Sequence, residues 1–290
     1  MRVRPTSALK YEDCPRKYYF SEVLKIRPLV QAANLAFGKV LHKTLTDWLE
    51  DWAYGQAYTG LGEQFKESWQ VEVEKAPIEY STTLGPEQVP AVGGRLADQF
   101  EERWETFELD IVFDASGKPL VERRFEVDLG EGVVLSTQPD LVVIDKDGFA
   151  GPLDLKTAAQ QTDEAFVEQA DQLTAQEIAI EAHAEDLLLS GVDRVGFGEM
   201  LKKPIPRTKQ GTGPQVLDPV FSPARSKEVK DAYRQKVIWI SEDIERGRFP
   251  ARSRMAYNSP CSLCDYRGLC KDGDATGLRI PGTSHQKLAA

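Results

Sequence analysis

The sequence has little of what marks a membrane-bound, exported or disulfide-built protein. No apolar run approaches the roughly 20 residues that a helix needs to cross a bilayer. The opening stretch, MRVRPTSALKYEDCPRKYYF, lacks the apolar segment of a signal peptide. There are four cysteines among 290 residues, and disulfides are rare in proteins that are not exported. We therefore expect a cytoplasmic protein with no membrane partner.

Motifs of several enzyme classes are also missing. The chain contains no GxSxG nucleophile elbow, no HExxH zinc motif and no Walker-type phosphate loop. These absences argue against an α/β-hydrolase, an HExxH metalloprotease and a P-loop nucleotidase. Any chemistry must come from another set of residues.

Positive charge is scarce over most of the chain. There are 36 Lys and Arg against 46 Asp and Glu, which gives a net charge of −10. This balance argues mildly against nucleic-acid binding, because phosphate partners favour positive charge. The segment from Lys202 to Lys236 is the exception, with nine basic residues against three acids. It is either a local surface for a phosphate chain or a solvated loop and helix.

The pattern of apolar residues predicts helices at both ends of the chain and strands between them. Helical segments are expected at 6–28, 37–52, 60–109 with an interruption at 85–94, 163–184 and 225–246. Strands are expected at 118–128, 133–145, 149–157 and 194–201, with a loop at 204–223. This order predicts an α/β fold with a mixed central sheet flanked by helices.

The segment TQPDLVVIDKDGFAGPLDLKTA, residues 137–158, contains the strongest candidate site. Its Asp147-Gly148 pair favours a hairpin turn, which would bring Asp140 and Asp154 onto neighbouring strands. Because side chains alternate along a strand, Asp154 and Lys156 share a face. Two carboxylates and the backbone carbonyl of Leu155 would offer oxygen ligands to Mg²⁺ or Mn²⁺. The alternative is a pair of edge-strand charges with no ligand.

The four cysteines have the spacing of metal ligands. Cys261, Cys264 and Cys270 form a CxxC pair with a third cysteine nearby, and Cys14 would complete a set of four thiolates. Such a set suits Zn²⁺ or an iron–sulfur cluster, and the spacing does not choose between them. Four unrelated buried thiols are the alternative.

Several stretches together resemble the PD-(D/E)XK nuclease superfamily, in particular its RecB-like branch with the AddB nuclease domain and the CRISPR-associated iron–sulfur exonucleases. The resemblance begins with Pro139-Asp140 followed by Asp154-Leu155-Lys156. It extends to the segment YEDCPRKYYF around Cys14, to FGKVLH ending at His42, and to the C-terminal CSLCDYRGLC. These stretches occur between residues 11 and 270 in the order of the family.

The resemblance implies a restriction-endonuclease-like core with helical N- and C-terminal additions joined by a metal cluster. It implies one nuclease domain over 1–270, with a core at about 37–202, followed by an irregular tail at 271–290. It also assigns roles. The implied metal ligands are His42, Asp140, Asp154 and the carbonyl of Leu155, with Lys156 and Gln172 as further catalytic residues.

The chain departs from the family at one helical position. Where the family often has Gln followed four residues later by Tyr, this chain has Gln172 and Gln176. The two would share a helix face, and a solvent-facing glutamine stripe is the alternative for Gln176.

The resemblance further implies a [4Fe–4S] cluster on Cys14, Cys261, Cys264 and Cys270, beside Mg²⁺ or Mn²⁺ at the acidic site. The implied activity is a DNA exonuclease that acts on ends or single strands. Because the sequence carries no helicase motif, we expect either a stand-alone nuclease or a subunit that depends on a helicase or recombination partner for unwinding. Two alternatives stay open: a DNA-binding or assembly subunit that cuts nothing, and a nuclease for CRISPR spacer acquisition.

Overall fold

The fold is taken from a computed structural model that describes residues 1–206, 211–252 and 260–282. The chain divides into two compact units. The larger unit comprises residues 31–127 and 137–230, and the smaller unit comprises residues 1–30, 128–136 and 231–290. The expectation of one nuclease domain over 1–270 stays a prediction.

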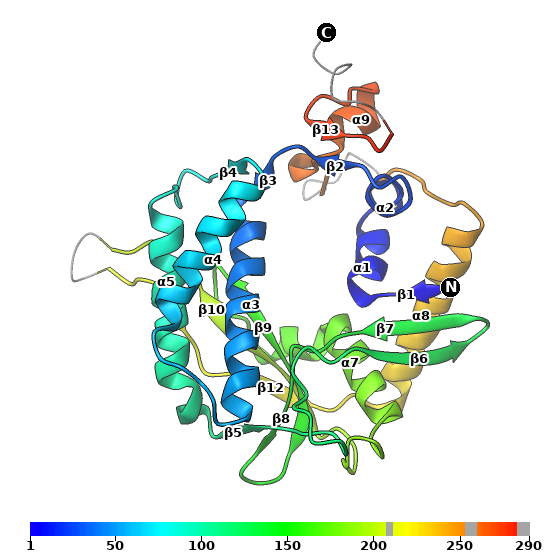
Figure 1. The fold of residues 1–290 in the computed structure, drawn as a ribbon. Coiled ribbons are helices and arrows are strands. Elements are labelled where there is room, and N and C mark those ends of the chain that lie inside the picture. Colours follow the sequence, from blue (N-terminus) through cyan, green and yellow to red (C-terminus); the bar gives the residue numbers. More distant parts are fainter. Residues whose placement is uncertain (207–210, 253–259, 283–290) are drawn as a thin grey trace. The chain divides into compact units, whose positions relative to one another are not determined.

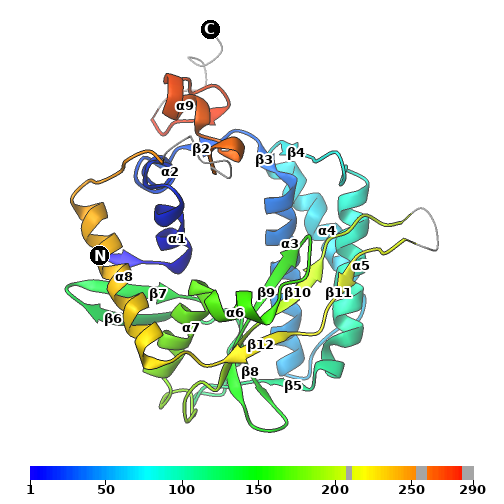
Figure 2. The same cartoon turned by 180° about the vertical axis from the view of Figure 1, so that it is seen from behind.

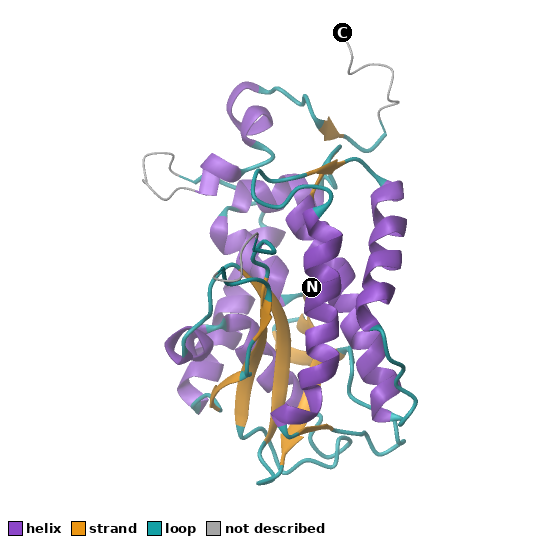
Figure 3. Ribbon diagram, turned by 90° about the vertical axis from the view of Figure 1, so that its left-hand side faces the viewer, coloured by secondary structure: helices purple, strands orange, loops and turns teal. Residues whose placement is uncertain are grey.

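The larger unit is built on a mixed sheet with the strand order β11-β10-β9-β8-β5, and β12 pairs with β10 (Figure 1). The strands β9 and β10 are parallel, whereas β8 is antiparallel to both β9 and β5. The strand bounds are β5 Leu109–Ile111, β8 Leu141–Asp145, β9 Ala150–Ala158, β10 Arg194–Leu201, β11 Gln215–Val216 and β12 Val220–Pro223. Figure 3, coloured by secondary structure, shows strands of the fold running side by side. The predicted mixed sheet is therefore confirmed.

Helices cover both faces of this sheet (Figure 2). Alternate residues of β8 enter different cores: Leu141 and Val143 pack with α3, α4 and α5, whereas Val142 packs with α6 and α7. The bounds are β3 Gln31–Ala32, α3 Ala33–Ala53, α4 Leu61–Lys75, β4 Ile78–Glu79, α5 Gln88–Arg103, the 3-10 helix Trp104–Phe107, α6 Glu164–Gln169 and α7 Asp171–Ala182. The period-two alternation of the strand thus builds two cores from one sheet.

The smaller unit is assembled from segments far apart in the sequence. The strand β1 pairs in parallel with β7, and β2 pairs with β13. A small core joins Phe20 and Ile26 to Tyr266 and Leu278. The elements of this unit are β1 Arg2–Val3, α1 Pro5–Asp13, α2 Pro15–Tyr18, the π-helix Tyr19–Val23, β2 Arg27–Pro28, the 3-10 helix Pro260–Leu263, α9 Arg267–Asp272 and β13 Leu278–Arg279. Three further elements contain residues of both units: β6 Phe125–Gly130, β7 Val133–Thr137 and α8 Lys227–Glu245.

Most predicted elements are present, with small shifts in their ends. The helix expected at 37–52 is α3, the strand expected at 194–201 has those bounds, and the strand expected at 149–157 is β9. The loop expected at 204–223 contains the short strands β11 and β12. The irregular tail contains β13 and the end of α9, and residues 283–290 lie outside the described part.

Two predicted strands are interrupted, each for a local reason. The strand expected at 133–145 is divided into β7 and β8 around Pro139, which has no N–H to donate to a ladder. The strand expected at 118–128 begins only at Phe125. Before it lies Glu122, whose φ of 50° is a left-handed backbone conformation that a strand does not contain.

The helix expected at 163–184 is also two helices, α6 and α7, with Ala170 extended between them. Val167 and Leu173 are both buried in one core. In a continuous helix, the side chains of residues six apart point about 120° apart around the axis. The break at Ala170 allows both side chains to enter the same core.

The interruption expected at 85–94 lies earlier, between the end of α4 at Lys75 and the start of α5 at Gln88. Residues 88–94 are helical although they include Gly93 and Gly94. A side chain at Gly93 would collide with the ring of Phe65 on α4. The glycine therefore permits close packing of two helices and does not break one.

No helix in the described part of the chain combines the length and the apolar character that crossing a membrane requires.

The close approach of β9 and β10 gives a prediction about stability. A Cβ atom on Gly151 would overlap the backbone carbonyl of Arg194, and a backbone atom cannot swing away as a side chain can. We expect Gly151→Ala to lower the free energy of unfolding by about 3 kcal/mol, measured by denaturant titration. Gly85→Ala is the control, because a Cβ there meets open space. Equal stability of the two variants would contradict the packing described.

Candidate active site

Separate segments of the larger unit bring the predicted site residues together. His42 lies on α3, Asp140 directly precedes β8, and Asp154 and Lys156 lie in β9. The hairpin pairs Leu141 with Leu153, and extending this register by one residue places Asp140 opposite Asp154. The juxtaposition predicted from the hairpin turn is therefore present.

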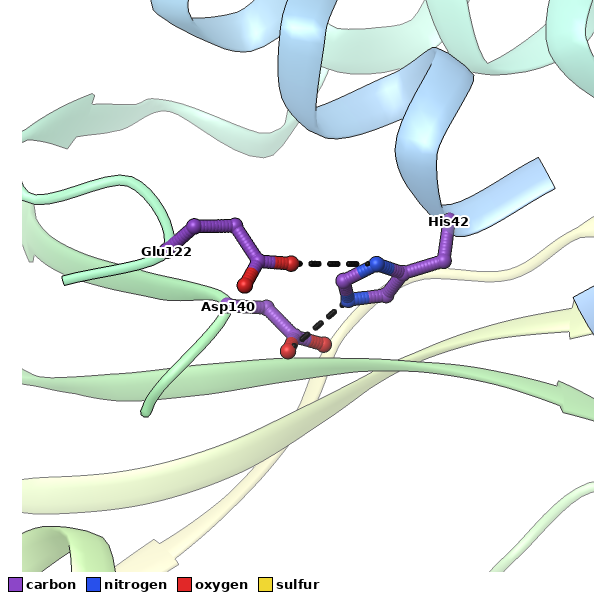
Figure 4. Close-up of side chains that lie close together, drawn as sticks. All are labelled: His42, Glu122 and Asp140. Atoms are coloured by element: carbon purple, nitrogen blue, oxygen red, sulfur yellow. Dashed lines mark ion pairs between the residues drawn. The ribbon is translucent and has the colours of Figure 1, made fainter. Parts of the chain in front are cut away.

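His42 lies between two carboxylates (Figure 4). Its Nε2 is 2.8 Å from Oδ1 of Asp140, and its Nδ1 is 3.1 Å from Oε1 of Glu122. The three side chains each offer one ligand atom within 4.8 Å of the others. Asp140 is further fixed by the backbone N–H of Leu155, which donates to its Oδ2 at 2.6 Å.

Asp154 is fully buried and is held by three side chains. The Nε2 atoms of Gln172 and Gln176 donate to its Oδ1 at 2.5 and 3.0 Å. The Nζ of Lys156 lies 2.5 Å from its Oδ2 and also donates to Oε1 of Gln172 at 2.9 Å. The carboxylate, the lysine and the first glutamine therefore form one network.

The alternative of a solvent-facing stripe is wrong for Gln176, which is fully buried. Its backbone lies four residues after Gln172 on α7, so both amides reach Asp154 from the same helix face. Within the described residues its Oε1 has no hydrogen-bond partner. Gln176 thus contacts the carboxylate of Asp154, as Gln172 does.

Burial and like charge dominate the electrostatics of the site. Burial raises the pKa of Asp140 to about 6, and the negative charge of Asp154 adds to the shift, while His42 opposes it. Burial alone would lower the pKa of His42. The hydrogen bond and charge of Asp140, together with Glu122 and Asp154, outweigh burial and raise the His42 pKa. The cluster therefore favours a bound cation.

The donor set fits a divalent metal ion. Imidazole nitrogen and carboxylate oxygen are ligands that Mn²⁺ accepts, and carboxylates also suit Mg²⁺. His42, Asp140 and Glu122 converge on one point, and Asp154 is close enough to shift the pKa values of the first two. The carbonyl of Leu155 as a ligand stays a prediction.

Glu122 is a site residue that sequence reasoning missed. It was expected inside a regular strand, where nothing marks it as special. Its position comes from tertiary structure: its N–H donates to the carbonyl of Asp140 at 2.9 Å, and Val121 forms an isolated bridge with Leu141. A non-glycine residue with positive φ is uncommon and is often found at functional sites. No local spacing in the sequence would have revealed it.

The four cysteines line one cavity of about 300 Å³ in the smaller unit. Cys14 is buried, and the other three are half-buried. Burial raises the pKa of the Cys264 thiol, the charge of Cys14 raises it further, and Lys17 opposes both. Thiols from the two sequence regions are therefore neighbours, as the spacing led us to expect.

Basic side chains surround the cysteine cavity. Its lining includes Arg16, Lys17, Arg252, Arg267 and Lys271. Positive charges favour the thiolate form of cysteine, which is the form that binds metal. The cavity thus fits a group held by four thiolates.

The basic segment from Lys202 to Lys236 does not offer all of its charge to a ligand. Lys230 is paired with Glu177 at 3.1 Å and with Glu181 at 2.6 Å, and Arg225 is buried. Two further pairs are Arg234 with Asp231 and Lys236 with Glu12. Arg207 and Lys209 lie outside the described residues. Carboxylates inside the protein therefore neutralise much of this segment.

Comparison with known proteins gives one family. The sequence model of the PD-(D/E)XK nuclease superfamily matches residues 2–271. A solved structure titled "Crystal structure of SSO0001" is similar with a TM-score of 0.37 and 10% identity, over 93% of this chain and 85% of that chain. No curated protein gives a significant match.

The contact of Glu122 with His42 predicts a role in metal binding. We expect Glu122→Gln to weaken Mn²⁺ binding by roughly ten- to hundredfold, because the substitution removes a charge from the ligand cluster. Isothermal titration calorimetry on the metal-stripped protein measures this affinity. Glu105→Gln, at an exposed carboxylate outside the cluster, is the control. Unchanged Mn²⁺ affinity in Glu122→Gln would remove Glu122 from the metal site.

Proposed function

The chain belongs to the PD-(D/E)XK nuclease superfamily, and from this premise we propose that it is a divalent-metal-dependent DNA nuclease. The observation that carries the proposal is the assembly around Asp154. A buried carboxylate, a lysine at 2.5 Å and the His42–Asp140 pair are all contributed by one compact unit.

Each residue has a distinct part in this proposal. His42, Asp140, Asp154 and Glu122 would hold Mg²⁺ or Mn²⁺, which supplies Lewis-acid polarisation of a phosphate and lowers the pKa of water. Lys156 offsets negative charge that develops on the phosphate. Gln172 binds both Asp154 and Lys156, so it fixes the distance between the acid and the cation.

The rival function is a DNA-binding or assembly subunit that cuts nothing. Such a subunit would have no need for a buried carboxylate beside a lysine, since burying charge is costly. The retained contact between Asp154 and Lys156 therefore favours an active enzyme. A role in CRISPR spacer acquisition would be a particular use of the same activity and is decided by gene neighbourhood.

An exposed aromatic ring beside the site favours single-stranded substrates. Phe166 on α6 is 59% exposed, and its ring centroid lies 6.2 Å from that of Phe197. The Nζ of Lys156 lies 5.7 Å from the centre of the Phe197 ring. Unpaired bases stack on exposed aromatic side chains, whereas bases inside a duplex are already stacked. We therefore infer a preference for DNA ends and single strands.

The nuclease proposal is tested by cleavage of labelled oligonucleotides with Mg²⁺ or Mn²⁺. We expect Lys156→Met and Asp154→Asn to lower the cleavage rate by at least about a hundredfold, because each removes stabilisation of the transition state. Lys146→Met is the control, since Lys146 lies in the hairpin turn and pairs with Glu108.

Cleavage of linear single-stranded, duplex and circular single-stranded DNA distinguishes an exonuclease from the other proposed functions. An exonuclease that prefers single strands cleaves a linear single strand, cleaves the duplex more slowly and spares a circular single strand. A wild-type protein that binds these substrates and cleaves none of them would establish the silent subunit. Full activity in Lys156→Met would overturn the active-site assignment.

We also propose that Cys14, Cys261, Cys264 and Cys270 hold one [4Fe–4S] cluster. The four thiols line one cavity of about 300 Å³ together with basic side chains, which favour the thiolate form. Four thiolates are the ligand set of such a cluster. The resemblance of the cysteine pattern to that of the iron–sulfur nucleases favours the cluster over a zinc ion.

The cluster proposal predicts brown protein with four irons and four labile sulfides per chain after purification without oxygen. We expect Cys14→Ala to lose the colour and to lose stability on the order of 4 to 5 kcal/mol, by analogy with a disulfide that closes a loop of this length. Iron and sulfide analysis with thermal denaturation checks both. Colourless wild-type protein with one zinc and no iron would replace the cluster by a zinc site.

A further inference from the structure

The cleft beside the metal-binding cluster contains a lysine that the proposed chemistry does not use. Lys39 lies three residues before His42 on α3, so the two side chains share a helix face about 5 to 6 Å apart at their Cβ atoms. Both line one cleft together with Lys156 and Leu155. The cleft therefore has a second cation, one helical turn from the ligand cluster.

Lys39 is held by a buried carboxylate that it shares with another lysine. Glu72 on α4 is 4% exposed and accepts from Nζ of Lys39 at 2.7 Å and from Nζ of Lys75 at 2.9 Å. These hydrogen bonds lower the pKa of Glu72. Two lysines and one carboxylate leave the group with one net positive charge at neutral pH.

Lys39 can contact an anion without leaving Glu72. An ammonium group has three N–H donors, and the hydrogen bond to Glu72 uses one of those on Lys39. The others can point to a ligand in the cleft. The side chain of Lys39 is 61% exposed, so its ammonium group can reach an anion in the cleft.

We propose that Lys39 binds a phosphate of the nucleic acid next to the one that is cleaved, so that the cleft selects a polynucleotide over an isolated phosphodiester. The proposal rests on the proposed nuclease function, which places the cleaved phosphate at Asp154 and Lys156. Lysine is a compact cation that binds phosphate as a point charge. Glu72 is a positioning residue, which keeps the ammonium group at the cleft before the substrate arrives.

A group of ion pairs that merely neutralises the buried carboxylate of Glu72 is the competing interpretation. It treats Lys39 and Lys75 alike, because both pair with Glu72 and both are about equally exposed, at 61% and 60%. The two differ in place, since Lys39 lines the cleft and Lys75 is absent from its lining. Lys75→Met is therefore a matched control for Lys39→Met: each removes one positive charge from the same carboxylate.

The test compares these two variants of the whole protein on two substrates. One is a single-stranded oligonucleotide, and the other is bis(p-nitrophenyl) phosphate, a diester with a single phosphate. We expect Lys39→Met to raise the KM for the oligonucleotide by roughly tenfold, as the loss of one charge-assisted contact would. Its hydrolysis of the small diester should equal that of the wild type. Lys75→Met should match the wild type on both substrates.

Binding measured by fluorescence anisotropy without turnover, in Ca²⁺, separates this inference from the nuclease proposal. For the single-stranded oligonucleotide, we expect Lys39→Met to reduce the slope of log affinity against log salt by about 0.7, and Lys39→Arg to restore it. Equal behaviour of Lys39→Met and Lys75→Met in binding would overturn the inference while leaving the nuclease proposal standing. A wild type that cleaves nothing, with binding weakened in Lys39→Met alone, would overturn the nuclease proposal and leave the phosphate contact standing.

Discussion

Like charges held close together in a dry environment are the constraint on which this site depends. Asp140 and Asp154 lie opposite each other at the start of a hairpin, and both are buried. Their repulsion and the loss of water would expel them from an ordinary core. The protein offsets this cost with the imidazole of His42, the ammonium group of Lys156 and two glutamine amides. The imidazole comes from α3, the ammonium group from β9, and the amides from successive turns of α7. A bound cation would complete the compensation.

Several breaks in regular secondary structure occur next to the residues of this site. The ladder stops at Pro139, so Asp140 is placed at the beginning of β8 and not within a continuous strand. The backbone has positive φ at Glu122, whose carboxylate is the second one in contact with His42. The extended residue Ala170 starts α7 two residues before Gln172. At each break, regular backbone hydrogen bonding stops, and a residue of the site takes a position that a continuous strand or helix would not give it.

These interruptions also mark the limit of prediction from sequence. The alternation of β9 and the turn at Asp147-Gly148 are local properties, and they were enough to pair Asp154 with Lys156 and with Asp140. The contact of Glu122 depends on the bridge between Val121 and Leu141, twenty residues apart in the chain, and no local pattern encodes it. Gln176 could be placed on the right helix face, but whether that face met solvent or Asp154 depended on how α7 packs on the sheet. Gly93 illustrates the same limit. From sequence alone a glycine predicts a break in the helix, and only the packing of Phe65 against Gly93 shows that the glycine permits close contact between two helices.

The division of the chain into units has a consequence for synthesis on the ribosome. All segments of the larger unit have been made once residue 230 is added, whereas the smaller unit draws on residues 1–30, 128–136 and 231–290. At about 5 to 20 residues per second, the segment with Phe20 and Ile26 waits roughly 10 to 50 seconds for Tyr266 and Leu278, the residues with which it forms a core. Throughout that interval its apolar side chains and the thiol of Cys14 have no native partners from the C-terminal region. The nascent chain is then most exposed to chaperones, to oxidants and to aggregation, although its candidate nuclease site can already have folded.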